Sequence, residues 1–201
     1  MREAANIHPP LEILGPRIRL RKPRLADAPV LEEQVRRPEV TRWTTRIPHP
    51  YPPGGALRFL RSAARRWAQG RDFIYVLEPL ENPVACGVVS LAQVSREHGC
   101  AELGFWLGSD YWGRGWMTEA VGLALEIAFT RLGLFRIYAS CYADNSAARR
   151  VLEKNGFQLE GRLRQAVVKH GARRDYLLFG LLAPEYSRRA PEQSHEEAAK
   201  R

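Results

Sequence analysis

The stretch that decides the fold is AELGFWLGSDYWGRGWMTEAVGLALEIAFTRL, residues 101–132. Near its start, Leu103, Phe105 and Leu107 recur at every second position, which is typical of a half-buried strand. Beyond the glycine-rich middle, the apolar residues recur at helical spacing. The sequence therefore predicts a strand, a tight turn and a helix in direct succession.

Gly113 and Gly115 lie between that strand and that helix. A helix start leaves its first amides unpaired, and glycines let a ligand approach them closely because they lack Cβ atoms. Such a site favours phosphate. The turn matches neither the dinucleotide fingerprint, because Thr118 stands where a third glycine would be, nor a P-loop, because no Gly-Lys-Ser/Thr follows. Two glycines alone could also do no more than turn the chain.

A wider pattern around this turn is more specific. It comprises ELGFWL at 102–107, DYWGRG at 110–115, TEA at 118–120, Asn145, Arg149, LEKNGF at 152–157, Glu160, Gly161, Asp175 and Tyr176. This combination resembles the acetyl-CoA-binding core of the GNAT N-acetyltransferases, and most of all the branch with the RimJ/RimL-type ribosomal-protein N-terminal acetyltransferases. The resemblance covers most of residues 16–182. It implies an α/β (α+β) fold with a mixed, mostly antiparallel central sheet, flanking helices and a splayed pair of strands.

The rest of the chain can be read as strands and helices around this core. We expect strands at 16–22, 72–78, 84–94 and 135–142, helices at 29–37, 56–69 and 146–154, and a hairpin at 163–182. Asp27 is the expected cap of the first helix. The proline-rich loop at 47–54 and its flanking helices resemble the segment that lines the acceptor cleft in the family. By the same resemblance, the splay between the strands near residues 102 and 137 receives the pantetheine arm.

Length and composition favour one globular domain. The chain has 201 residues, of which 45% are hydrophobic and 26% charged. We expect residues 1–15 to be a loosely held lead-in, residues 16–183 a single GNAT-like acetyltransferase domain, and residues 184–201 a flexible charged tail.

Charge and cysteine content limit the partners and the compartment. The net charge of +9 favours polyanions such as coenzyme phosphates, ribosomal RNA or acidic protein faces, and argues against a polycationic substrate unless a local acidic pocket reverses the field. Cys86, Cys100 and Cys141 are widely spaced and form no paired framework, which favours a reducing compartment. With no apolar leader and no stretch of membrane-spanning length, a cytoplasmic location is expected.

The resemblance also implies which residues bind acetyl-CoA. The main chain of Phe105, Trp106 and Leu107 would pair with the pantetheine amides, and Asn145 would hold the coenzyme. The pyrophosphate would bind the turn and helix start, formed by Gly113, Arg114, Gly115, Trp116, Met117 and Thr118. Arg149 would meet a coenzyme phosphate or be solvated. The outer positions depart from the widespread Gln/Arg-x-x-Gly-x-Gly/Ala form, because they are Trp112 and Met117. Trp112 thereby removes a side-chain donor, and binding would depend more on Arg114.

Acetyl transfer also needs a base for the amine and an acid for the departing thiolate. Glu102 is the candidate base, with a rim carboxylate that only positions the ammonium as the alternative. The serine that the family branch places three residues after the asparagine is Ala148 here, so Tyr142, Ser146 or solvent must supply the proton. Glu119 is explained by the helix dipole. The histidines show no metal-ligand spacing, and no metal is expected.

The resemblance therefore implies an N-acetyltransferase that moves an acetyl group from acetyl-CoA to an amine by direct attack in a ternary complex. The acceptor expected for this branch is a protein N-terminal α-amine, such as that of a ribosomal protein, and the basic surface would contact the ribosome. One alternative is a small-molecule amine or antibiotic N-acetyltransferase. A non-enzymatic alternative is a basic RNA- or ribosome-binding module that retains the fold. Both a monomer and a homodimer are compatible with the sequence.

Overall fold

A computed structural model describes residues 8–187, which build one eight-stranded sheet in the order β1-β2-β3-β4-β5-β6-β8-β7. The strands are β1 (Glu12–Leu14), β2 (Ile18–Arg21), β3 (Phe73–Pro79), β4 (Gly87–Ser95), β5 (Cys100–Leu107), β6 (Arg136–Tyr142), β7 (Gln158–Lys169) and β8 (Ala172–Leu182). Within this sheet β5 and β6 pair in parallel, and all other neighbours are antiparallel. The mixed, mostly antiparallel sheet expected from the sequence is confirmed.

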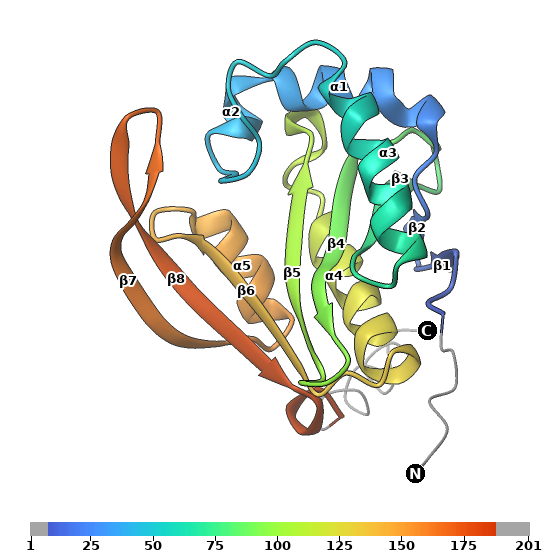
Figure 1. Cartoon of the computed structure of the whole chain (residues 1–201), viewed down its shortest axis with the longest axis vertical. Helices are drawn as coiled ribbons and strands as arrows, with labels where there is room; N and C mark the ends of the chain where they lie inside the picture. The colour runs from blue at the N-terminus through green and yellow to red at the C-terminus, as the bar shows by residue number, and fades with distance from the viewer. Residues whose placement is uncertain (1–7, 188–201) are drawn as a thin grey trace.

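Helices cover both faces of the sheet. They are α1 (Ala28–Arg36), α2 (Pro38–Thr41), α3 (Gly55–Ala68), α4 (Trp116–Glu126) and α5 (Ser146–Lys154), and a π-helical segment, Ile127–Arg131, continues α4. In Figure 1, α3 lies in front of β3 and β4, whereas α4 and α5 lie behind the sheet. The short helices α1 and α2 lie above the sheet in that view, close to the upper end of the splay.

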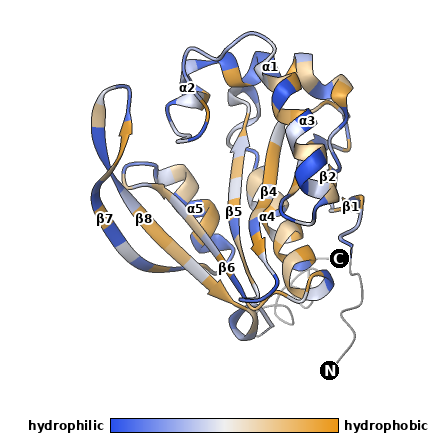
Figure 2. Ribbon diagram, viewed as in Figure 1, coloured by the Kyte–Doolittle hydropathy of each residue, from blue (hydrophilic) through white to orange (hydrophobic). Residues whose placement is uncertain are grey.

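The central strands are apolar on both sides because each face of the sheet packs against helices. In β3, Phe73, Tyr75 and Leu77 belong to the larger core, which includes residues of α4 and α5. The alternating residues Ile74 and Val76 pack in a second core with residues of α1 and α3. Figure 2 shows the hydrophobic colours concentrated on the central strands and α4, with strongly hydrophilic bands on α3.

The predicted splay lies between β5 and β6. The parallel pairing runs from Cys100 opposite Arg136 to Glu102 opposite Tyr138. β5 then continues to Leu107 and β6 to Tyr142, and the two strands diverge toward the top of Figure 1. β6 stays paired with β8 along its whole length. One edge of β5 is therefore open over its second half.

Two expectations about the chain ends need correction. Residues 12–14 are not a loose lead-in, because they form β1 and pair with β2. Residues 184–187 are not a frayed tail, because they are helical and the Tyr186 ring lies 4.9 Å from that of Phe129. In both places an aromatic or sheet contact orders residues whose local sequence gives little signal. The remainder of the predicted lead-in and tail, residues 1–7 and 188–201, lies outside the described residues. No helix within residues 8–187 combines the length and apolar character needed to cross a bilayer.

Asp27 does not cap α1 with its side chain. Its carboxylate instead accepts two hydrogen bonds from the Arg21 guanidinium, at 2.9 and 2.7 Å, and one from the Arg24 amide at 2.7 Å. Glu78 binds the same guanidinium at 2.8 and 2.5 Å, and Arg19 as well. Arg21, Asp27 and Glu78 are all buried. The alternation along β2 gives no sign of this network, because the carboxylates that bind Arg21 lie outside that strand.

Candidate functional site

The glycine turn presents main-chain amides at the start of α4. Gly113 and Gly115 have φ angles of 78° and 76°, in the left-handed region that residues with a Cβ rarely adopt. Gly115 is the N-cap, and no side chain caps the helix there. The next two side chains, Trp116 and Met117, are buried in the larger core. The turn therefore has the geometry expected of an anion site built from backbone groups.

Two arginines add positive charge beside this turn. The Arg114 guanidinium lies 4.9 Å from the centre of the Trp116 ring. Arg17 Nη1 donates to the Arg114 carbonyl at 3.1 Å, and Arg17 Nε donates to Glu119 Oε2 at 2.9 Å. Glu119 Oε1 also accepts from the Arg17 and Ile18 amides, at 2.9 and 3.2 Å. Glu119 thus fixes α4 to β2, and it holds Arg17, which lies at the start of the predicted strand 16–22, beside the turn.

The register between β4 and β5 decides which main-chain groups face the splay. The Gly108 amide donates to the Cys86 carbonyl at 2.8 Å. Since hydrogen-bonding groups alternate along an antiparallel pair, the main chain of Trp106 also faces β4, whereas that of Phe105 and Leu107 faces the splay. The expected pairing with pantetheine is therefore narrowed to Phe105 and Leu107. Trp106 contributes its side chain to a cavity on the α3 side of the sheet.

Trp112 is a hydrogen-bond donor in this structure. Its Nε1 donates to the Leu107 carbonyl at 2.8 Å, although the residue is 45% exposed. The loss of a phosphate donor expected at Trp112 is therefore only part of what this residue does. The indole fixes the end of β5 against the turn and takes up the Leu107 carbonyl. The Phe105 amide and carbonyl and the Leu107 amide are the main-chain groups of this pair of residues that remain for a ligand.

At the start of α5, the expected coenzyme residues have local partners. Asn145 is buried, and its Oδ1 accepts from the Ala148 amide at 3.0 Å as the helix N-cap. Arg149 Nε donates to Glu153 Oε1 at 2.7 Å across one helical turn. Ser146 is exposed at the first helical position and does not line the cavity. Coenzyme contacts by Asn145 and Arg149 stay predictions.

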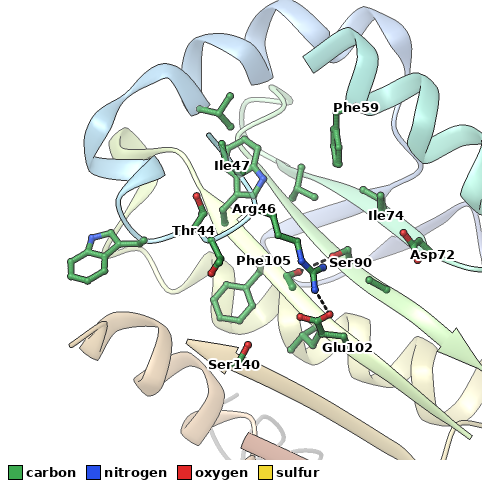
Figure 3. A pocket seen from close by; sticks show the side chains of 18 of the residues that line it. Thr44, Arg46, Ile47, Phe59, Asp72, Ile74, Ser90, Glu102, Phe105 and Ser140 are labelled. Carbon is green, nitrogen blue, oxygen red and sulfur yellow. Dashed lines mark hydrogen bonds and ion pairs between the residues drawn. The ribbon is translucent and has the colours of Figure 1, made fainter. Parts of the chain in front are cut away.

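A cavity of about 590 Å³ opens beside the splay, between β5, β6, α3 and the loop that follows α2. Much of its wall is apolar, and the residues concerned include Leu31, Val35, Ile47, Phe59, Trp106 and Tyr176. Its polar groups come from separate elements, as Figure 3 shows for Arg46, Asp72, Ser90, Glu102 and Ser140. An apolar pocket with a few convergent polar groups is the usual form of a small-molecule or peptide site.

Glu102 faces this cavity from the last position at which β5 pairs with β6, and its side chain is 17% exposed. Its Oε2 accepts from Gln93 Nε2 at 2.9 Å and forms an ion pair with Arg46. Gln93 lies at a bulge in β4 and has a φ of 52°, which aims its side chain at the carboxylate. Glu102 was predicted from the sequence, but neither Gln93 nor Arg46 was predicted as its partner. The β-bulge that orients Gln93 cannot be recognised from the sequence. For Arg46, the sequence indicated only that it lies next to the proline-rich loop.

Tyr142 lies on β6, the other side of the splay, and lines the same cavity. It is 1% exposed, and its hydroxyl has no hydrogen-bond partner among the described residues. Its ring lies 5.1 Å from that of Tyr176 and 4.2 Å from the Arg174 guanidinium. Burial raises the pKa of the Tyr176 phenol above its ordinary value, and the nearby Tyr142 contributes to the same shift. Of the two acid candidates named from the sequence, the structure brings Tyr142 and not Ser146 to the cavity.

Within residues 8–187, no group of three or more histidine, cysteine, aspartate or glutamate side chains is arranged to hold a metal ion. His49 and His170 come close to each other, with ring centroids 5.5 Å apart. They lie where the tip of the β7–β8 hairpin meets the loop after α2.

Comparison with known proteins places this site in a family. The model of the acetyltransferase (GNAT) domain matches residues 17–158. An uncharacterized N-acetyltransferase, p20 of Bacillus licheniformis, is 32% identical over 173 residues, which is 85% of this chain and 96% of that protein. The structure of Mycobacterium smegmatis RimJ in complex with CoA-disulfide has a TM-score of 0.76 and 26% identity, and covers 84% of this chain and 83% of that one.

Relatives with named acceptors match a shorter part of the chain. The ribosomal-protein-serine acetyltransferase of Escherichia coli is 31% identical over 93 residues, covering 46% of this chain and 52% of that protein. The spermidine N(1)-acetyltransferase of Escherichia coli is 29% identical over 100 residues, covering 50% and 54%. The amide-lined turn and the open edge of β5 are features expected of a coenzyme A site, and the match to the family model agrees with them. The chain belongs to the GNAT acetyltransferases, a family whose acetyl donor is acetyl-CoA.

Proposed function

We propose that this enzyme acetylates the N-terminal α-amine of a protein by direct attack on acetyl-CoA in a ternary complex. The observation that carries the proposal is that the open edge of β5 and the acceptor cavity meet at Glu102. A thioester lying along the splay and an amine entering from the α3 side would reach the same point. Holding both reactants at one point replaces a bimolecular encounter by a local one.

Donor binding would use the groups that face the splay and the turn. The main chain of Phe105 and Leu107 would pair with the pantetheine arm, and the amides from Gly113 to Thr118 would hold the pyrophosphate. Arg114 and Arg17 add positive charge at that turn. Acetyl-CoA supplies the activated acetyl group. The chain supplies the geometry that presents it to the amine.

Glu102 is the proposed base, either directly or through a water molecule. Gln93 and Arg46 hold its Oε2, so Oε1 is the oxygen left for the amine among the contacts of the described residues. Tyr142 is the proposed acid because its buried hydroxyl lies across the splay from Glu102 and is not engaged by another described residue. The exposed Ser146 is less suited, since it lies outside the cavity.

A protein N-terminus fits the cavity better than a polyamine does. The carboxylates of the cavity are already paired with arginines, because Asp72 pairs with Arg66 at 2.6 Å and Glu102 pairs with Arg46. A second ammonium on the acceptor would therefore find no uncompensated carboxylate among these groups. The similarity to a ribosomal-protein-serine acetyltransferase supports an N-terminal acceptor. We include in the proposal a cytoplasmic location, contact with the ribosome through basic surface, and a monomeric or homodimeric state.

The second candidate acceptor is a small-molecule amine. The volume of the cavity, about 590 Å³, is within the usual range for small-ligand pockets, about 300–1,000 Å³. The similarity to a spermidine acetyltransferase also keeps this class in view. The compensated carboxylates favour an amine with no further positive charge.

A turnover screen tests the proposal. Release of the CoA thiol would be measured with peptides that have free N-termini, with the same peptides blocked at the α-amine, and with small amines that include spermidine. Turnover that needs the free α-amine, with the acetyl group located there by mass spectrometry, supports the proposal. Turnover with small amines alone would move the assignment to the second candidate. Saturable acetyl-CoA binding without turnover of any acceptor would contradict both.

A further inference from the structure

We infer that Arg46 selects acceptors that carry a carboxylate close to the amine that is acetylated. The inference rests on the proposed function and deepens it, because it names the chemical class of N-terminus that the cavity takes. For a peptide, the class is one with an acidic side chain at its first or second residue. The juxtaposition of Arg46 with Glu102 carries the inference.

Arg46 reaches into the cavity from the loop between α2 and α3, and its guanidinium points at the Glu102 carboxylate (Figure 3). Its side chain is 67% exposed, so packing does not lock it in place. The loop itself is anchored, because Lys169 Nζ at the tip of the β7–β8 hairpin donates to the Ile47 carbonyl at 2.6 Å. The main chain beside Arg46 is thus held while its long side chain can re-aim.

In the free protein the guanidinium occupies Oε2 of the same carboxylate that an acceptor ammonium would use. Once an ammonium binds Glu102, two cations share one carboxylate, which like-charge repulsion disfavours. An acceptor with its own carboxylate removes this conflict, because Arg46 can turn from Glu102 to that group and form a bidentate pair. An acceptor whose corresponding group is an amide leaves the guanidinium without an anionic partner.

The other arginines in or near the cavity are not available to bind an acceptor carboxylate. The Arg66 guanidinium is bound to Asp72 at 2.6 Å. Arg174, whose guanidinium lies over the ring of the cavity residue Tyr142, is bound to Asp144 and donates to the Arg42 carbonyl at 3.2 Å. Arg46 is the cavity arginine whose carboxylate partner is itself the proposed amine-binding group. Selection by charge therefore falls on Arg46.

Matched peptide pairs test the inference. The members of each pair are identical except for aspartate or asparagine at the first or second residue, which changes charge at constant shape. We expect the wild-type enzyme to prefer the aspartate member by about tenfold in kcat/KM, mostly through KM, as a solvent-accessible charge-assisted pair allows. Arg46→Gln should abolish the preference, and Arg46→Lys should retain part of it. Arg61→Gln, which removes an exposed arginine on α3 outside the cavity, should leave the preference intact.

Binding of the same pairs, measured by calorimetry in the presence of CoA, separates this inference from the proposed function. Tighter binding of the aspartate member that disappears in Arg46→Gln supports the inference, even if no peptide is acetylated and the proposed function fails. Equal kcat/KM and equal affinity for the two members would overturn it. A preference that persists in Arg46→Gln, or no binding of either member, would overturn it as well.

Discussion

Tyr142→Phe separates a catalytic from a structural role of this tyrosine. The residue is 1% exposed, and its hydroxyl binds no other described residue. Removing the oxygen therefore costs no protein hydrogen bond, and the ring keeps its contacts with Tyr176 and Arg174. A buried polar group without a partner costs about 1–3 kcal/mol. We expect the free energy of unfolding of the variant to equal that of the wild type or to exceed it by up to about 1 kcal/mol.

Catalysis should be impaired by the same substitution that leaves stability unchanged or increased. A positioned general acid contributes about 10²–10⁴ to the rate. Without the phenol, kcat should fall by at least about 100-fold, whereas the dissociation constant of acetyl-CoA should not change. The assays are release of the CoA thiol under saturating acceptor, and urea and thermal unfolding of the protein without ligand.

Tyr75→Phe is the matched control, because Tyr75 is equally buried but its hydroxyl donates to the Pro10 carbonyl at 2.8 Å. This variant should lose about 1 kcal/mol of stability, or about 2–4 °C in Tm for a chain of this size, with full activity. If Tyr142→Phe loses stability as Tyr75→Phe does, its hydroxyl has a partner in solution. If it keeps the kcat of the wild type, Tyr142 is not the acid and the thiolate takes its proton from solvent.

The remaining predictions concern the donor turn, the base and the buried ion network. Arg114→Ala should raise the acetyl-CoA dissociation constant about tenfold at low salt and less at high salt; unchanged affinity by calorimetry would remove Arg114 from the phosphate site. Glu102→Gln should lower kcat by at least about 100-fold, and full turnover between pH 6 and 9 would exclude a base role. Asp27→Asn should destabilise the protein by about 3–5 kcal/mol, because it leaves the buried Arg21 guanidinium poorly compensated. Burial raises the pKa values of Asp27 and Glu78, but hydrogen bonds and positive charge together outweigh it and lower both, from Arg21 and Arg24 for Asp27 and from Arg21 and Arg19 for Glu78. Wild-type stability from this network should therefore be complete above about pH 4 and be lost as the pH falls through the lower folded-state values. Urea midpoints that fall equally in the wild type and in Asp27→Asn over this range would contradict that assignment.

Sequence reasoning succeeded where neighbouring residues act on each other directly. Leu103, Phe105 and Leu107 predicted β5 by their alternation, and the left-handed φ angles of Gly113 and Gly115 explain why glycine is needed at the turn. These features depend on contacts within a few residues. The mixed, mostly antiparallel sheet was implied by the family resemblance, and the structure confirms it.

It failed where a side chain's partner lies far away along the chain. Arg17 lies in the strand predicted at 16–22, but its partner Glu119 is 102 positions away. Arg46 directly precedes the predicted proline-rich loop, but its partner Glu102 is 56 positions away. Charge and spacing within a segment carry no information about such partners.

The sequence by itself determined the strand, turn and helix of the donor site, because backbone geometry and hydrophobic period are local. The tertiary structure alone decided that Gln93 and Arg46 meet on Glu102, that Trp112 closes the end of β5, and that Tyr142 rather than Ser146 faces the cavity. These facts depend on strand register, on a bulge and on the divergence of β5 from β6. Register and divergence are set by the packing of helices on both faces of the sheet, which no single segment encodes.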